Sequence, residues 1–303
     1  IKLGEKNLEQ FRNFTNKLYN AANFLQLNIE TFPDLKDIEI KTSLGLYMQS
    51  RLSVAVDELR DNLETFKFNE AASTLYKFVW NEFCNWGIEY SKGSKDSILE
   101  LGAIFKETLK MISPFMPFIA DFLYHKLSGT TLEEGESLMI NNFPKNIAKN
   151  QEVEDMFAII EEAIISVRRA KVVIDMGNSK IVKAYIKLDA SIDKEVAKPF
   201  IEKLGKVENI EFVDSKVENS ITDVSDNLEV YLPTSEIDMS PIIDKLTKQQ
   251  AKTQKEFDKL NGMLSNERFV ANAPEAVIAE NRQALEDAKN KLEKIENELK
   301  AIS

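Results

Sequence analysis

Cysteine and histidine, which most often hold transition metals or act as nucleophile and base, are nearly absent, because the 303-residue chain has one of each. A single cysteine, Cys84, excludes an intramolecular disulfide and fits a reducing compartment, so we expect a cytoplasmic protein. A zinc site built from several cysteine and histidine ligands is excluded as well, and we expect no metal. Cys84 lies in the aromatic stretch WNEFCNW, where a small packed thiol is the expected role.

A Ser-His-Asp site would have to use the one histidine, His125. This residue lies near a predicted helix end, before Gly129, where the helix dipole favours a cation. The sequence offers no nucleophile motif to partner it, so a stand-alone enzyme that uses His125 is a remote hypothesis. We assign no catalytic residue.

Long apolar runs and an excess of positive charge are also missing. No run approaches the roughly 20 apolar residues that span a bilayer, so we expect no membrane partner. The chain has 39 Lys and Arg against 50 Asp and Glu, a formal net charge of −11. Indiscriminate binding to nucleic acid depends on neutralising phosphates, so this acidic balance argues against it, and we expect no DNA partner. A protein that reads one folded RNA through local contacts is still compatible with it.

Hydrophobic residues make up 43% of the chain, enough for a buried core, and they recur at helical spacing through region 1–143. No strand-like alternation intervenes, so this region predicts a helical bundle. Pro114 and Pro117 should bend or break its last helix, and the adjacent Phe115 and Phe118 should pack in the core. The predicted helices span residues 5–28, 44–59, 68–90 and 98–126.

Region 144–240 changes character and predicts a small α+β module. A helix over about 153–171 is followed by IVKAYIKL at 181–188, whose period-two alternation is typical of a half-buried strand. A charged helix near 193–204 follows, and we expect about three strands in an antiparallel or mixed sheet. The later strands are predicted at 207–213 and 227–233.

Region 241–303 predicts a hairpin of two helices. Apolar residues follow a/d heptad spacing from Ile243 to Leu264 and again from Leu285 to Ile302, the pattern of an antiparallel coiled coil. The charges of this region cancel, at 11 Lys and Arg against 11 Asp and Glu. Many coiled coils mediate dimerisation, so a coiled-coil interaction protein without a catalytic role is the alternative function.

Four stretches, in the same order along the chain, resemble the C-terminal half of bacterial valyl-tRNA synthetases. In the predicted bundle they are RNFTNKLYNAANFL at 12–25, WNEFCNWGIEYSK at 80–92 and ISPFMPFIADFLYHKL at 112–127. The last is similar to the HPFMPFITEELW segment of the family, with Ser113 where the family often has histidine. The fourth, LSNERFVANAPEAVIAENRQALEDAKNKLEKI at 264–295, looks like the tip and returning helix of the C-terminal arm and is the most particular to the valyl enzymes.

The resemblance implies a mainly α chain in three parts: an anticodon-binding helical bundle over 1–143, a small α+β module over 144–240 and a coiled-coil tRNA-binding arm over 241–303. It implies that the chain recognises valine tRNA at the anticodon loop and the elbow, as part of a valine--tRNA ligase.

The HIGH-type and KMSKS-type catalytic signatures of this class of enzyme are absent from the sequence. We therefore expect the ATP, valine and editing sites to lie in an N-terminal catalytic half outside this chain. The chain opens at Ile1, which also suggests a piece of a longer protein. By itself it is expected to be non-catalytic and to need no cofactor.

Related synthetases read the anticodon from the first bundle helix. On the corresponding helix of this sequence, Arg12, Asn16 and Asn20 are spaced i, i+4, i+8 and so share one face. Arginine supplies a planar charged donor and asparagine both a donor and an acceptor, which suits reading base edges. The same residues can instead cap or cross-link helices. Lys17 is expected to be solvated or to face a phosphate.

Trp86, between Asn85 and Gly87, is a candidate surface for base stacking, and a buried packing role is the alternative. Trp80 lies in an apolar run and is expected in the core. On the arm, lysines at steps of 3, 4 and 3 form a stripe that can follow a phosphate backbone or simply keep the arm soluble. The stripe is Lys245, Lys248, Lys252 and Lys255, and the tip candidates are Arg268 and Asn272.

The central module also carries a group of cations. Arg168, Arg169, Lys171 and Lys180 lie around a predicted turn at Gly177 and Asn178. They are candidates for contact with the tRNA or with the catalytic half.

Overall fold

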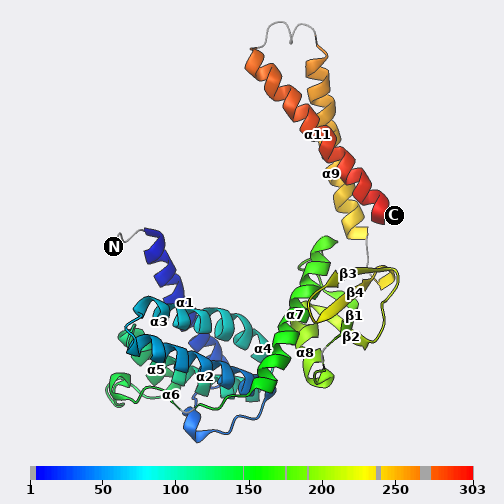
Figure 1. Cartoon of the computed structure of the whole chain (residues 1–303). Coiled ribbons are helices and arrows are strands. Elements are labelled where there is room, and N and C mark those ends of the chain that lie inside the picture. The colour runs from blue at the N-terminus through cyan, green and yellow to red at the C-terminus, as the bar shows by residue number, and fades with distance from the viewer. Residues whose placement is uncertain are drawn as a thin grey trace.

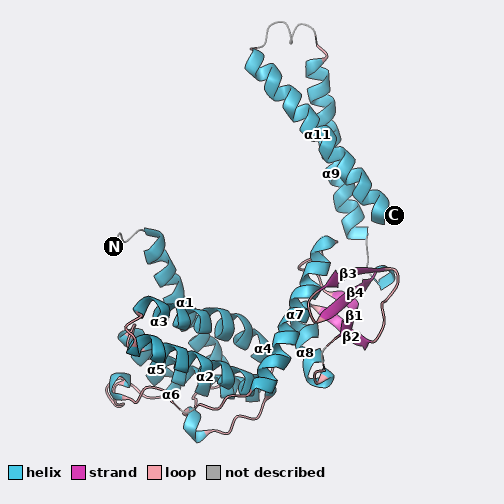
Figure 2. Ribbon diagram, viewed as in Figure 1, coloured by secondary structure: helices cyan, strands magenta, loops and turns pink. Residues whose placement is uncertain are grey.

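The protein consists of a helical bundle, a small sheet with helices against it, and a long helical hairpin that projects away from the sheet (Figures 1 and 2). Helix predominates over strand, which confirms the predicted mainly α class with a small α+β module. The computed structural model describes residues 5–145, 147–174, 176–189, 191–236, 240–266 and 274–302.

The bundle follows the predicted helices because their apolar faces meet in one core. Its helices are α1 (Glu5–Asn28), α2 (Ser43–Glu64), α3 (Phe68–Tyr76), α5 (Lys95–Ile112) and α6 (Pro117–Ser128), with short 3-10 turns η1 (Leu35–Asp37) and η3 (Leu138–Ile140). Buried side chains from different helices share the core, among them Leu18, Met48 and Phe105. Thr42 and Ser94 begin α2 and α5 as N-caps, since their hydroxyl oxygens accept hydrogen bonds from backbone N–H groups of the first turn.

The third predicted helix is continuous but not uniform. After α3 the chain passes through η2 (Lys77–Gly87) and α4 (Ile88–Ser91) without leaving the right-handed helical region at the joints. The segment η2 is π-helical, and the N–H of Ile88 donates to the carbonyl of Phe83, five residues earlier. Such wide turns are rare in proteins, and where they do occur they are often found at functional sites. Both tryptophans of the chain lie in η2.

The fourth predicted helix is broken at its prolines. Helix α5 ends at Ile112 and α6 begins at Pro117, whose fixed φ and missing N–H suit the first helical turn. The expectation that Phe118 packs in the core is wrong, because its side chain is 91% exposed. The first turn of α6 directs this residue outward, whereas Phe115 and Met116 are partly buried against the core.

The central module contains a mixed four-stranded sheet. Its elements are α7 (Gln151–Val173), β1 (Ile181–Leu188), α8 (Lys194–Gly205), β2 (Val207–Val213), β3 (Ser220–Val224) and β4 (Leu228–Pro233). The strand order is β2–β1–β4–β3, with β1 and β2 parallel across the crossover helix α8 and the other pairs antiparallel. Strand β3 was not among the predicted strands, because this edge strand is only partly buried and lacks a clear apolar alternation.

Helix α7 joins the bundle to the module, because it packs on α2 as well as on α8, β3 and β4. On the bundle side, Tyr47 of α2 stacks on Phe157 with ring centroids 4.3 Å apart. On the sheet side, Ile164 and Val167 are fully buried. One helix therefore contributes to both cores. The domain boundary between residues 143 and 144 stays a prediction.

The arm consists of α9 (Ser240–Leu264) and α11 (Glu275–Ile302), which follow the 3-10 turn η4 (Thr234–Glu236). The two helices lie side by side as a hairpin (Figure 1). Positions of the heptad pattern are those that the hairpin buries, including Leu246, Thr253 and Leu292. The two apolar stripes therefore cover each other within one chain, while the supercoil of a coiled coil stays a prediction.

A charged network lies where α7 meets the bundle. Arg51 donates through Nε to Glu82 and through Nη1 to Glu154, each at 2.8 Å. Further along α7, Glu161 accepts a hydrogen bond of 3.0 Å from the Tyr47 hydroxyl. Burial raises the pKa of Glu161 to about 7 against the lowering effect of the Tyr47 hydrogen bond, and the nearby Glu82 charge raises it as well.

We predict that Glu161→Gln stabilises the protein at neutral and alkaline pH. The folded protein holds the Glu161 proton up to about pH 7, whereas the unfolded chain releases it near the ordinary pKa of 4.5. Folding stability therefore falls as the pH rises between these values, and glutamine, which can still accept from Tyr47, removes the loss. Urea unfolding should give a free energy of unfolding about 1–2 kcal/mol above wild type at about pH 8 and no gain at about pH 4.

The control is Glu58→Gln, which neutralises an exposed carboxylate on α2 and should match wild type at both pH values. An equal gain from Glu161→Gln at both pH values would contradict the prediction, because the cost of the buried charge exists only when Glu161 is ionised.

Candidate functional site

The outer face of α1 presents the three residues that sequence spacing places in one row. The opposite face buries Phe14, Leu18 and other apolar residues in the bundle core. Arg12, Asn16 and Asn20 are all exposed. Arg12 forms one solvent-exposed ion pair, at 3.7 Å from Glu9 of the preceding turn, and such a pair restrains an arginine only weakly. The row is therefore open to a ligand.

Lys17, on the flank of α1, is held by the bundle rather than free in solvent. Its ammonium donates to the Asn85 side chain at 3.1 Å and lies 5.0 Å from the centre of the Trp80 ring. Trp80 is half-buried and stacks on Tyr76, which in turn stacks on Phe14, with ring centroids 5.4 and 5.6 Å apart. This ladder of rings ties the π-helical segment to α1.

Exposed aromatic side chains on and near α1 were not among the predicted site residues, and of these Tyr19 lies next to the row, beside Asn20. Phe11 is 64% exposed, Tyr76 is 43% exposed and Tyr19 is 41% exposed. The ammonium of Lys126 lies 4.8 Å from the Tyr19 ring centre and donates to the side chain of Asn23 at 2.6 Å. Exposed rings beside amides and cations suit the stacking and edge recognition of unpaired bases. The adjacency of Tyr19 to Asn20 was the only signal that the sequence offered.

Trp86 lies at the junction between the bundle and the central module. It is half-buried and stacks on Tyr90 with ring centroids 5.5 Å apart. The guanidinium of Arg168, from α7, lies 5.9 Å from the ring centre. The structure therefore gives Trp86 two packing partners and places it with the cations of the module, whereas Trp80 accompanies the α1 row.

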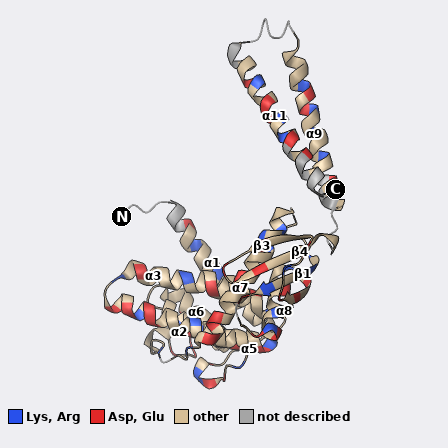
Figure 3. Cartoon of the chain, turned by 45° about the vertical axis from the view of Figure 1, so that its right-hand side comes forward, with Lys and Arg blue, Asp and Glu red and all other residues tan. Residues whose placement is uncertain are grey.

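The candidate stripe on the arm is exposed where the structure describes it. The side chains of Lys248, Lys252 and Lys255 are solvent-exposed on α9. The side chain of Lys245 and the residues Arg268 and Asn272 lie outside the described part of the chain. Basic and acidic residues alternate along both helices of the arm (Figure 3), so the stripe is local and not part of a uniformly basic surface.

The four cations predicted to gather in the module have different environments. Arg169 pairs with Asp223 at 2.7 Å and Lys180 with Glu208 at 3.3 Å. Arg168 is exposed but donates to a backbone carbonyl of α8, and Lys171 is fully buried. Two of the four are thus neutralised by carboxylates and two are not.

Cys84 and His125, the single cysteine and histidine of the chain, are both buried. Cys84 is buried, and burial raises the pKa of its thiol to about 12. His125 is buried near the end of α6, where its Nδ1 lies 2.8 Å from the Thr130 hydroxyl and its Nε2 lies 3.6 Å from Asp121. Within the described ranges, no three His, Cys, Asp or Glu side chains are arranged to hold a metal ion, and no helix is apolar over the length needed to cross a bilayer.

Comparison with known proteins finds two family matches in this chain. Residues 46–186 match the anticodon-binding domain of tRNA ligases, and residues 238–303 match the valyl tRNA synthetase tRNA binding arm. The first match begins after α1, so the Arg12 row lies outside it.

Similar proteins align over the whole chain. A protein named valine--tRNA ligase from a Nitratiruptor species is 54% identical over 303 residues, which are 100% of this chain and 34% of that protein. One from Wolinella succinogenes is 49% identical over 100% of this chain and 34% of its own length, and one from Aquifex aeolicus is 27% identical over 100% of this chain and 28% of its own. The chain thus spans about a third of the length of these relatives and corresponds to their C-terminal part.

We predict that Cys84 is unreactive in the folded protein. With a thiol pKa near 12, very little thiolate is present at about pH 8, and the side chain is also shielded from solvent. Labelling with a disulfide reagent should be at least about 100-fold slower in native protein than in protein unfolded in guanidinium chloride. Comparable rates in the two states would contradict the buried, packed role.

Proposed function

We propose that this chain, which belongs to the valine--tRNA ligase family and carries its anticodon-binding domain and tRNA-binding arm, recognises valine tRNA at the anticodon loop and the elbow. The observation that carries the proposal is the exposed row of Arg12, Asn16 and Asn20 on α1, with the exposed ring of Tyr19 next to Asn20. The match of the chain to both tRNA-binding families supports the same reading.

The row has the chemistry that unpaired bases require. The amides of Asn16 and Asn20 each offer a donor and an acceptor for a base edge, and Arg12 adds a charged planar donor. The ring of Tyr19 can stack on a base face, which an anticodon loop presents without unwinding a helix. A rigid bundle below the row keeps these groups in place, so less ordering entropy is lost on binding.

Ligation of valine to its tRNA with ATP is proposed for the whole protein and not for this chain alone. The chain spans about a third of its relatives' length and lacks the HIGH-type and KMSKS-type signatures. We assign the bond-making steps, with ATP as co-substrate, to a catalytic part of the protein outside residues 1–303. A cytoplasmic location belongs to the same proposal.

The alternative function, a coiled-coil protein that pairs with another chain, is not favoured. The apolar stripes of α9 and α11 cover each other within one chain, so the hairpin does not need a second chain to bury them. The tRNA-binding match over residues 238–303 points the same way.

We predict that Asn16→Ala and Asn20→Ala weaken binding of valine tRNA because each removes a contact with a base edge. The loss should be about tenfold for the native anticodon, as expected for a base-reading contact. It should shrink to less than about twofold for a tRNA whose anticodon has been changed, since that contact is already lost. Filter binding of both tRNAs to wild type and variants completes the double-mutant cycle.

The matched control is Asn142→Ala, an exposed asparagine outside α1, which should bind both tRNAs as wild type does. If Arg12→Ala, Asn16→Ala and Asn20→Ala all bind like wild type, or lose equally with both tRNAs, the row does not read the anticodon.

We predict that replacing Lys248, Lys252 and Lys255 together by glutamine lowers the salt dependence of tRNA binding. Each lysine that neutralises a phosphate releases counterions, so the slope of log K against log salt should become shallower by about 2. The effect should be the same for native and changed anticodons, because the arm contacts the backbone elsewhere on the tRNA.

The control for the arm replaces three other exposed lysines, Lys36, Lys95 and Lys145, by glutamine. This variant has the same net charge as the arm variant. An equal change of slope in both variants would mean that net charge, and not the arm stripe, sets the salt dependence.

A further inference from the structure

Four cations lie around the C-terminal end of α8, and each binds a backbone carbonyl. The guanidinium of Arg168 donates to the carbonyl of Leu204, at 2.9 Å from Nη2, and the buried ammonium of Lys171 donates to the carbonyl of Gly205 at 3.0 Å. The other two members follow the same pattern. Lys203 donates to the carbonyls of Tyr90 and Lys92 in the bundle, and Lys206 donates to the carbonyl of Asn178.

These four residues, Arg168, Lys171, Lys203 and Lys206, form what we call the carbonyl-bound cluster. Among the residues that the structure describes, no carboxylate lies within ion-pair distance of any of them. Neighbouring acids pair with other cations: Glu89 with Lys92, Glu208 with Lys180 and Glu202 with Lys198. Of these acids, Glu89 is also near enough for its charge to act on Lys203.

Carbonyl oxygens satisfy the hydrogen bonds of the cluster but do not cancel its charge. A helix C-terminus carries only about half a negative charge, against four full positive charges here. Burial, and after it the positive charges of Lys206 and Arg168, lower the pKa of Lys171 to about 8. In a chain with a net charge of −11, the cluster is a local excess of positive charge.

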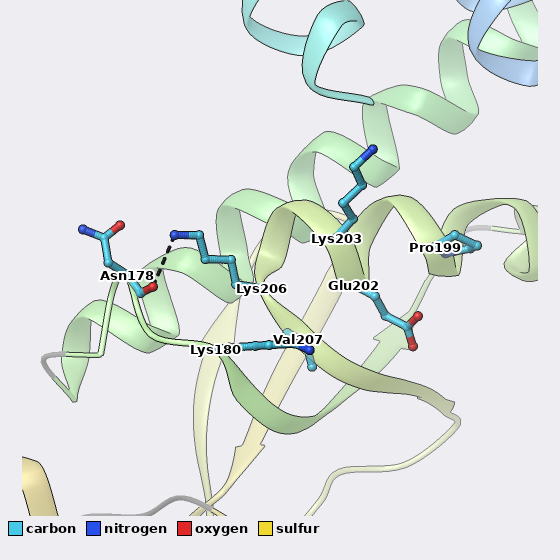
Figure 4. Close-up of a pocket in the computed structure, with 7 residues that line it drawn as sticks. All are labelled: Asn178, Lys180, Pro199, Glu202, Lys203, Lys206 and Val207. Atoms are coloured by element: carbon cyan, nitrogen blue, oxygen red, sulfur yellow. Dashed lines mark hydrogen bonds between the residues drawn. The ribbon is translucent and has the colours of Figure 1, made fainter. Parts of the chain in front are cut away.

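The cluster borders a hollow on the surface of the module. The hollow has a volume of about 420 Å³. Figure 4 shows Lys206 reaching to Asn178 across one side, while Lys203 points toward the bundle and Glu202 points away from both. The lining residues are Asn178, Lys180, Pro199, Glu202, Lys203, Lys206 and Val207. Three lysines and an asparagine outnumber the single carboxylate of Glu202 in this lining, so the hollow fits an anion better than an apolar or cationic ligand.

We propose that this hollow binds the phosphodiester backbone of the RNA through the exposed Lys203 and Lys206, while buried Lys171 adds only to the local positive charge, at a site separate from the α1 row and the arm stripe. The inference rests on the proposed function, since it takes its partner to be the same tRNA. The module lies between the bundle and the arm (Figure 1), so an RNA that contacts both can also reach the module. Backbone contacts of this kind fix position and carry no base information.

Lys206→Gly is the decisive variant because it removes charge without straining the fold. Lys206 ends α8 in the left-handed region, at φ 55°, a conformation that glycine adopts more readily than any other residue. Thermal unfolding should therefore show a midpoint equal to or above that of wild type. At about 0.1 M salt, binding of valine tRNA should be about fivefold weaker, and the salt slope should be shallower by about 0.7 to 0.9.

Two control variants test whether the effect of Lys206→Gly comes from the lost charge at this position, and not from the backbone conformation or from the loss of any lysine on α8. Asn219→Gly gives the same conformational relief at φ 52° without a change of charge. Lys194→Gln removes an exposed lysine from the opposite end of α8, about 18 Å away along the helix. Both variants should bind tRNA with the wild-type affinity and salt slope.

The outcomes distinguish this site from the proposed function as a whole. A loss confined to Lys206→Gly, equal for native and changed anticodons, supports a backbone site. If wild type binds tRNA and Lys206→Gly matches Asn219→Gly, the site is overturned while the proposed function stands. If wild type does not bind valine tRNA in preference to an unrelated tRNA, the proposed function fails first.

Discussion

The packing of α7 on two cores is the constraint on which the rest of the structure depends. Its Phe157 stacks on Tyr47 of the bundle, and its Glu154 pairs with Arg51 of α2. Two turns further on, the same helix is buried against the sheet through Ile164 and Val167. Because a helix is stiff over this length, the bundle and the module are held in a fixed relation, and the arm follows from the last strand of that sheet.

That constraint lets three separate surfaces serve one ligand. The α1 row is open because the apolar face of α1 is satisfied within the bundle, and the arm is slender because its two helices satisfy each other. The cations around the C-terminal end of α8 bind backbone carbonyls of the module and the bundle. Together they also make this part of the surface locally positive. Lys203 illustrates the overlap, since it binds the Tyr90 and Lys92 carbonyls of the bundle and lines the hollow of the module.

Much of this fold could be predicted from the sequence, because long helices leave a strong apolar periodicity, and the family resemblance is confirmed by the comparisons. Features decided by tertiary contacts were missed. Lys17 is held by Asn85, 68 residues away, and no local pattern shows that. The edge strand β3 lacked alternation, and Phe118 was apolar enough to be expected in the core although the first turn of α6 directs it to solvent. The site residues themselves stay predictions.

Hydroxyl-radical footprinting of valine tRNA bound to this chain tests the central claim most directly, because it maps every contacted part of the RNA in one measurement. The account predicts simultaneous protection of the anticodon loop and the elbow, with the intervening backbone protected where it passes the module. Protection of one end alone, or of neither, would contradict the proposal that the bundle and the arm of this chain contact the same folded RNA.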